Sequence, residues 1–204
     1  MFVALPGRRS YDGLWFVLFV VLVFVGSAVV SLPESDRPAE AISSFYQVHR
    51  SAVVITQAVG LAAVVVLLMV LAVLLRWVGG GWPLLISGGL VALASLGTAV
   101  PVLVLALDDR LGASGTISAA RWADWSDDAL FITIALFVGV VATRMQTSAL
   151  RVSCIVVAVA CGLRGVGAPL GFHALDVVAP LMFLILMIWL GIARLRTSPA
   201  IRSE

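Results

Sequence analysis

The chain has 204 residues, of which 62% are hydrophobic and 12% are charged, and its formal net charge is +2. A soluble domain is about 45–50% apolar and about 25% charged, so this composition excludes a water-soluble fold. It predicts an integral membrane protein whose first partner is the lipid bilayer, and we expect no nucleic-acid partner.

Six apolar segments follow one another along the chain, separated by charged loops. A membrane-spanning helix needs about 20 mostly apolar residues, and continuous apolar runs of this length are not typical of barrel strands. We therefore predict an all-α, polytopic membrane protein. It is expected to form one bundle of six transmembrane helices over residues 14–32, 52–76, 83–107, 128–144, 151–170 and 175–193.

The N-terminal segment and the two longest connections carry further expectations. Arg8 and Arg9 precede the first apolar segment, which resembles a signal peptide in this respect, but we expect the segment to be retained as a span. Residues 39–50 are expected to be helical and to continue into the second span. Residues 108–127 are expected to form a turn followed by a short interfacial helix before the fourth span.

The distribution of Arg predicts the orientation. Eight of the 13 Arg residues lie on the side that carries both termini, whereas nine of the 11 acidic residues lie on the other side. The net charges of the two sides are +6 and −4. Because positively charged loops stay in the cytoplasm, we expect a cell (plasma) membrane protein with both its N- and C-termini inside.

Arg164 is the only Arg inside an expected span, and a charge at such a depth is costly unless it is paired. Asp128 and Asp176 lie at the outer ends of the neighbouring fourth and sixth spans, at a similar height. We predict that Arg164 pairs with Asp176, Asp128 or both, and so locks these spans together. The alternative is that Arg164 binds an anion or a lipid headgroup.

His49, His173 and Gln57 are the other polar candidates. The two histidines lie at the outer ends of their spans, where they could join Asp128 or Asp176 in a metal site, but no spacing typical of metal ligands accompanies them. We therefore assign no metal ligand, no catalytic residue and no cofactor. Gln57 is the most polar group well inside a span, so the chain lacks the ionisable groups of an ion pump.

Small residues recur at helical spacing in three spans. One face of the third span carries Ser87, Val91, Ala94, Ser95 and Thr98, and the pairs Ala135/Gly139 and Ala158/Gly162 occupy the fourth and fifth spans. Small residues let helices approach closely in lipid, which predicts helix packing and a homo-oligomer or another membrane-protein partner at these faces. The alternative is that the face of the third span lines a polar path with Gln57.

Several motifs along the chain resemble those of a broad group of uncharacterised six-helix bacterial integral membrane proteins, a domain of unknown function. They are Phe45-Tyr46-Gln47-Val48-His49-Arg50 before the second span, Asp127-Asp128-Ala129-Leu130-Phe131 at the fourth, Arg151 at the fifth and Trp189 before the basic tail. The resemblance implies six helices, and it implies no activity, substrate or catalytic residue.

Three functional hypotheses remain. The first is a non-enzymatic accessory or structural membrane subunit. The second is a carrier or channel for a small or lipophilic solute, with Gln57 and the small face of the third span lining its path. The third is an outer-face membrane enzyme or a haem or metal protein built on His49, His173, Asp128 and Asp176.

Overall fold

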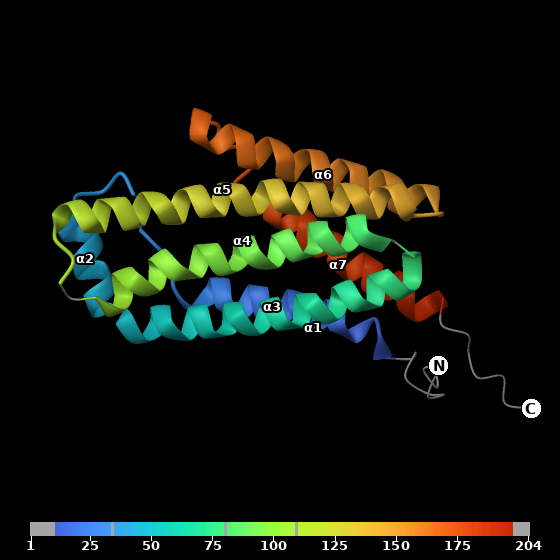
Figure 1. Cartoon of the computed structure of the whole chain (residues 1–204), viewed down its shortest axis with the longest axis horizontal. Helices are drawn as coiled ribbons and strands as arrows, with labels where there is room; N and C mark the ends of the chain where they lie inside the picture. The colour runs from blue at the N-terminus through green and yellow to red at the C-terminus, as the bar shows by residue number, and fades with distance from the viewer. Residues whose placement is uncertain (1–10, 34, 80, 109, 198–204) are drawn as a thin grey trace, which may run out of the picture.

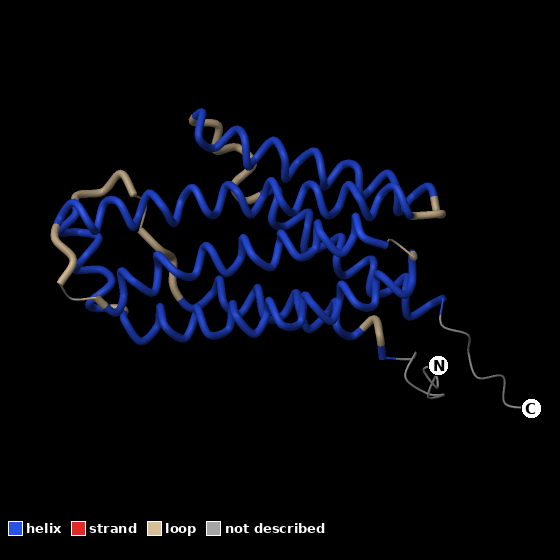
Figure 2. The backbone as a smooth tube through the Cα atoms, in the orientation of Figure 1, coloured by secondary structure: helices blue, strands red, loops and turns tan. Residues whose placement is uncertain are grey.

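The computed structural model describes residues 11–33, 35–79, 81–108 and 110–197. Over these residues the protein is all-α and contains no strand, which confirms the all-α part of the prediction (Figure 2). The helices are α1 (Leu14–Val29), α2 (Ala39–Val48), α3 (Arg50–Val78), α4 (Gly81–Leu107), α5 (Ala113–Arg144), α6 (Ser148–Gly167), the short 3-10 helix η2 (Ala168–Leu170) and α7 (Val178–Thr197).

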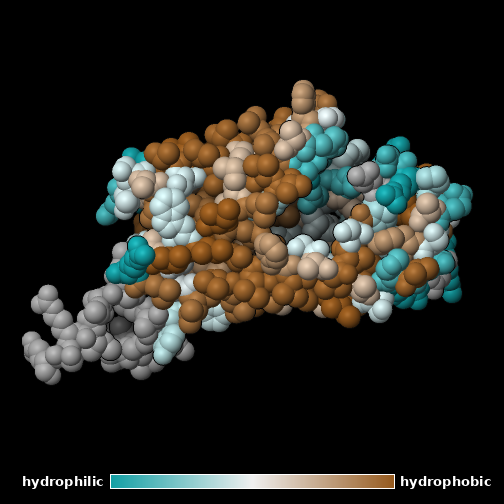
Figure 3. All heavy atoms as spheres, turned by 180° about the vertical axis from the view of Figure 1, so that it is seen from behind, coloured by the Kyte–Doolittle hydropathy of each residue, from teal (hydrophilic) through white to brown (hydrophobic). Residues whose placement is uncertain are grey.

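Five helices, α3 to α7, are long and apolar enough to cross a membrane, the α6 segment being continued by η2. The helix α1 is also apolar but has only 16 residues. Large apolar side chains remain exposed along all of them and form the brown band in Figure 3. So much contiguous apolar surface is unfavourable in water, and these helices indicate a membrane protein.

The long helices run side by side and close a ring. Contacts connect α1 to α3, α3 to α4, α4 to α5, α5 to α6, α6 to α7, and α7 back to α1 (Figure 1). The short helix α2 lies across one end of this bundle, against α3, α4 and α5. We call this the α2 end. The opposite end, where α1 begins and α7 ends, is called the terminal end.

Two groups of buried apolar side chains hold the ring. The larger one includes Phe16, Leu74, Phe137 and Met187, which are almost fully buried and come from α1, α3, α5 and α7. The smaller one lies beneath α2 and consists of Ile42, Tyr46, Val53, Val102, Leu105, Ala106 and Ala120. The amphipathic helix α2 therefore caps its end of the bundle with its own small core.

The α5 helix departs most from its predicted form. It begins at Ala113, so residues 113–127 are the first turns of one 32-residue helix rather than a turn and a separate interfacial helix. At about 1.5 Å per residue it is about 48 Å long, more than the roughly 30 Å of a bilayer core. The helix continues through its charged residues because its first half packs against both α2 and α4, where Ala119, Ala120 and Ala123 join the smaller core.

The α2 and α3 helices also differ from the expected continuous helix. The backbone of His49, at φ −104° and ψ 17°, separates them. Elsewhere small residues set the helix distances. A Cβ atom on Gly162 of α6 would lie 3.6 Å from the Cβ of Ala135 on α5, and one on Gly191 of α7 would lie 2.9 Å from the Cβ of Phe16 on α1. One residue from each predicted small face, Ala135 of α5 and Gly162 of α6, therefore meets the other within the chain, whereas a Cβ atom on Gly139 of α5 would meet nothing within 4 Å.

Candidate functional site

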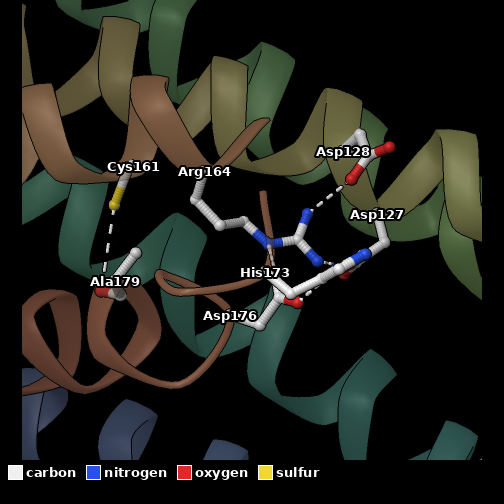
Figure 4. A network of polar contacts seen from close by, with 7 residues as sticks. All are labelled: Asp127, Asp128, Cys161, Arg164, His173, Asp176 and Ala179. Carbon is white, nitrogen blue, oxygen red and sulfur yellow. Dashed lines mark hydrogen bonds and ion pairs between the residues drawn. The ribbon is translucent and has the colours of Figure 1, made fainter. Parts of the chain in front are cut away.

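Arg164 lies in the last turn of α6, and only 11% of its side chain is exposed. Its guanidinium group points from α6 towards α5 and the loop before α7 (Figure 4). The planar group also covers the ring of Phe131 on α5, with 4.2 Å between Cζ and the ring centroid. The aromatic ring thus covers part of a cation that is largely withdrawn from solvent.

Three carboxylates surround this guanidinium group. Nη1 donates to Oδ1 of Asp128 at 2.7 Å, and Nη2 donates to Oδ2 of Asp127 at 2.5 Å. Nε lies 3.4 Å from Oδ1 of Asp176. The structure therefore brings together Arg164, Asp128 and Asp176, which the sequence singled out, and adds Asp127. Every nitrogen of the guanidinium group faces a carboxylate.

The path of the chain explains this geometry. Asp127 and Asp128 are consecutive residues of α5, and the long, forked Arg side chain reaches both. Gly165, next to Arg164, has no side chain to hold α6 away from α5. Asp176 lies in the turn between η2 and α7, where its Oδ2 is 2.9 Å from Nδ1 of His173.

A polar cavity of about 640 Å³ opens beside this cluster at the α2 end. Five carboxylates contribute to its wall but only one guanidinium group: Asp36, Asp124, Asp127, Asp128 and Asp176 against Arg164. The indole of Trp125 and the imidazole of His173 also line this cavity. With neutral His173, the formal charge of this wall is −4.

A second cavity, of about 400 Å³, lies inside the ring of helices. Its wall is mostly apolar and comes from α1, α3, α4, α5 and α7, with residues such as Phe19, Leu22, Leu67, Val91 and Phe183. Gln57, Ser95 and Thr98 add polar groups. The Ser95 and Thr98 hydroxyls donate within their own helix, to the carbonyl oxygens of Val91 and Ser95, both at 2.8 Å.

The hydroxyl group of Thr56 is a further polar group in the wall of the apolar cavity. The Oγ1 atom of Thr56 is buried and has no hydrogen-bond partner among the described residues. A buried hydroxyl without a partner is unfavourable. The apolar cavity therefore offers a solute a hydrogen-bonding group at Thr56 in addition to Gln57.

The two cavities are adjacent parts of one system. A third cavity of about 330 Å³ shares Asp124 with the polar cavity and shares Gln57 and Thr98 with the apolar one. Asp127 lines all three. In Figure 3 a hollow opens on this face of the molecule, between the apolar band and the polar α2 end. The Arg164 cluster thus stands at the entrance to the apolar interior.

Tyr46 of α2 closes part of the third cavity. It is 3% exposed, and burial, together with the nearby negative charge of Asp124, raises the pKa of its phenol to about 12. The side chain is therefore a neutral hydroxyl group at physiological pH, next to the carboxylates of the entrance.

The histidines are not brought into one site. His49 stacks on Phe45 with ring centroids 4.5 Å apart and lies 3.1 Å from the Phe45 carbonyl oxygen through Nδ1. It lines none of the three cavities, whereas His173 lines the polar one. Among the residues that the structure describes, no group of three or more His, Cys, Asp or Glu side chains is arranged to hold a metal ion.

The terminal end is closed by a different ion pair. Asp12, 8% exposed, accepts a hydrogen bond from Nη2 of Arg194 at 3.0 Å and lies 3.6 Å from Nη2 of Arg76. It connects the start of α1 with the ends of α7 and α3. Nothing in the pattern of the sequence singled out this residue, which is separated from Arg194 by almost the whole chain.

Comparison with protein-family models, with curated proteins and with solved structures found no match.

Proposed function

We propose that this protein is a six-span membrane protein that binds a small lipophilic solute between its helices, the first step in the cycle of a carrier. In this proposal α1 is the sixth span and both termini face the cytoplasm across a cell membrane. Support for the orientation comes from the terminal end, where Arg76, Arg144, Arg194 and Arg196 gather in the last turns of α3, α5 and α7.

The observation that carries the proposal is the apolar cavity of about 400 Å³ lined by five helices. Ligand sites are typically clefts of about 300–1,000 Å³ with apolar walls and a few polar groups. This cavity has that character, since Gln57, Thr56 and Thr98 interrupt a wall of aliphatic and aromatic side chains. Gln57 and part of the small face of α4, on which the carrier hypothesis was based, therefore line a cavity that is large enough for a small solute.

The accessory-subunit hypothesis has less support. Of the small residues that could dock a partner helix, Gly162 of α6 packs against Ala135 of α5 inside the chain, whereas Gly139 of α5 remains open. The haem or metal hypothesis needs His49 and His173 in one site, and these residues lie in separate surroundings. The cavities support solute binding and give no support to the other two hypotheses.

A cavity-filling substitution tests the proposal. Gly60 of α3 lines the apolar cavity, and a Cβ atom there would meet nothing within 4 Å. Gly89 of α4 is equally open but lines none of the cavities described above. Gly60→Leu should reduce the cavity, whereas Gly89→Leu is a matched control that adds the same side chain to a helix without reducing it.

The measurement is equilibrium dialysis of a labelled neutral probe, phenylbutane carrying a tert-butyl group, against protein in lipid nanodiscs and against empty nanodiscs. We expect saturable, protein-dependent binding that Gly60→Leu weakens by about tenfold or more, equivalent to about 1.4 kcal/mol. Gly89→Leu should bind as the parent protein does. Absence of saturable binding, or equal loss in both variants, would overturn the proposal.

A further inference from the structure

We infer that the solute is an organic cation: its ammonium group lies between Asp124 and Asp127, and its apolar body extends into the cavity lined by α1, α3, α4, α5 and α7. This inference rests on the proposed solute binding and specifies the chemical class of the ligand. It depends on three features of the same space, which are its charge, its aromatic side chains and its apolar compartment.

The charge of the entrance favours a cation. The positive charge of Arg164 is already surrounded by three carboxylates, with Asp128 and Asp127 accepting its hydrogen bonds and Oδ1 of Asp176 3.4 Å from Nε, so an added anion would meet net negative charge. Asp124 forms no hydrogen bond or ion pair with any residue that the structure describes and is exposed in the same wall. The entrance therefore keeps uncompensated negative charge, which attracts a cation and repels an anion.

Asp127 is the link between the charged and the apolar spaces. Its Oδ2 accepts from Arg164, yet 45% of its side chain is exposed and it lines the polar, the apolar and the third cavity. A ligand that touches Asp127 can therefore place one end among carboxylates and the other among Phe19, Phe131 and Phe183. An amphiphilic molecule suits this arrangement better than a simple ion.

Aromatic rings stand next to the carboxylates. Trp125 lines the polar cavity with Asp124, and Tyr46 lines the third cavity with the same residue. Aromatic faces attract ammonium groups through their π electrons, and sites for quaternary ammonium combine such rings with a water-excluding wall. The combination of rings and carboxylates selects an organic ammonium over a hydrated metal ion, which needs several converging oxygen ligands.

The apolar compartment holds the body of the ligand but gives little selectivity. Its apolar wall contacts the hydrocarbon part of a cation, an anion or a neutral molecule in the same way, so these contacts do not distinguish between them. Discrimination must then come from the polar end. For this reason the test compares molecules that differ only in the charge of that end.

Three labelled probes are dialysed against the protein in zwitterionic nanodiscs: phenylbutyl-trimethylammonium, its neutral tert-butyl isostere and phenylbutyl sulfonate. We expect the cation to bind about tenfold more tightly than the isostere, and the sulfonate to bind more weakly than both. Asp124→Asn should remove most of the cation's advantage and leave the isostere unchanged. Asp124 has no ion pair among the described residues, so this variant retains the Arg164 cluster.

Glu40→Gln is the matched control, because it removes one negative charge from α2 at the same end of the bundle but outside the cavities described above. It should leave all three affinities unchanged. Equal binding of cation and isostere, equal effects of Asp124→Asn and Glu40→Gln, or preferential binding of the sulfonate would overturn the inference while the isostere's binding preserves the proposed function. Failure of all three probes to bind would contradict both.

Discussion

Gly165 of α6 lies directly against the backbone of Asp128 on α5. A Cβ atom at Gly165 would stand 2.8 Å from the Asp128 carbonyl oxygen and 2.7 Å from Cγ1 of Ile132. No real side chain tolerates such distances, so the absence of a side chain at Gly165 allows the two helices to touch. The contact brings the preceding residue, Arg164, within reach of the carboxylates of α5.

The first prediction follows from this contact. Gly165→Ala should destabilise the protein by about 1–3 kcal/mol, the usual cost of forcing an extra carbon into a packed interface. Gly139→Ala in α5 is the control, because a Cβ atom there would meet nothing within 4 Å. Melting in detergent measures both, and a Gly165→Ala variant as stable as Gly139→Ala would show that the helices do not touch here.

The second prediction concerns Arg164 and its partners. Arg164→Ala leaves three carboxylates facing one another, so it should cost about 3–5 kcal/mol, as for a buried pair that loses one member. Adding Asp128→Asn, whose side chain is 15% exposed, should recover part of this loss. Adding Asp176→Asn, at 34% exposure and 3.4 Å, should recover less.

A double-mutant cycle in detergent provides the coupling energies for this cluster. The expected order is a stronger coupling of Arg164 to Asp128 than to Asp176. Additive effects of Arg164→Ala and Asp128→Asn would mean that the pair contributes nothing and that Arg164 reaches the lipid headgroups instead.

The apolar segments made much of this fold predictable. Each long helix coincides with a continuous stretch of apolar residues. Such a stretch must form its backbone hydrogen bonds within itself when it crosses a membrane, so the helix can be predicted from local sequence alone. The helix ends were less predictable, as α5 shows: its charged residues predict the start of a span at residue 128, whereas packing against α2 and α4 continues the helix through residues 113–127. The part of this packing that α2 contributes comes from a segment more than 60 residues earlier in the chain.

The candidate site was predictable in part for a similar reason. Arg164, Asp128 and Asp176 stand out because a charge near lipid needs a partner, and their heights follow from helix geometry. Asp127 was missed because a sequence does not show that one guanidinium group reaches two consecutive carboxylates. The apolar cavity depends on how five helices leave space between them, and no local pattern encodes it.

The third prediction concerns the terminal end. Asp12 and Arg194 have side chains 11% and 14% exposed at a distance of 3.0 Å, whereas Arg76 is 64% exposed and lies 3.6 Å away. Arg194→Gln should therefore cost about 3–5 kcal/mol, as for a buried pair, and Arg76→Gln only about 0–1 kcal/mol, as for a surface pair. Both variants lose one guanidinium group near the carboxylate of Asp12. If thermal melting shows equal losses of stability for the two, Arg194 is no more strongly paired with Asp12 than Arg76 is.

The fourth prediction is a pH dependence centred on Tyr46. Because its pKa is raised from 10.0 to about 12 in the folded protein, the folded state favours the neutral phenol. The resulting stabilisation is complete below about pH 10 and is lost as the pH rises towards 12. The difference in tyrosinate absorbance between the parent protein and Tyr46→Phe should therefore appear only near pH 12.

Unfolding in denaturant at pH 10 and at pH 12 provides the second measurement for Tyr46. The parent protein should lose stability relative to Tyr46→Phe between pH 10 and 12. Tyr11→Phe is the control, since Tyr11 is 66% exposed, and it should leave the Tyr46 signal in place. A tyrosinate signal from Tyr46 below pH 10 would contradict its burial beside Asp124.

The fifth prediction is the orientation in the membrane. Ser35 lies before α2, at the α2 end, and Ser148 begins α6 at the opposite end of the bundle. In a background without Cys154 and Cys161, single cysteines at these two positions should respond differently to a membrane-impermeant thiol reagent added to intact cells. Position 35 should be labelled and position 148 should not, because the Arg-rich terminal end is expected to face the cytoplasm. Permeabilised cells should show labelling at both positions, which establishes that each thiol is accessible. Labelling of position 148 in intact cells would reverse the proposed orientation, and it would place the Arg164 cluster and its carboxylates on the cytoplasmic side.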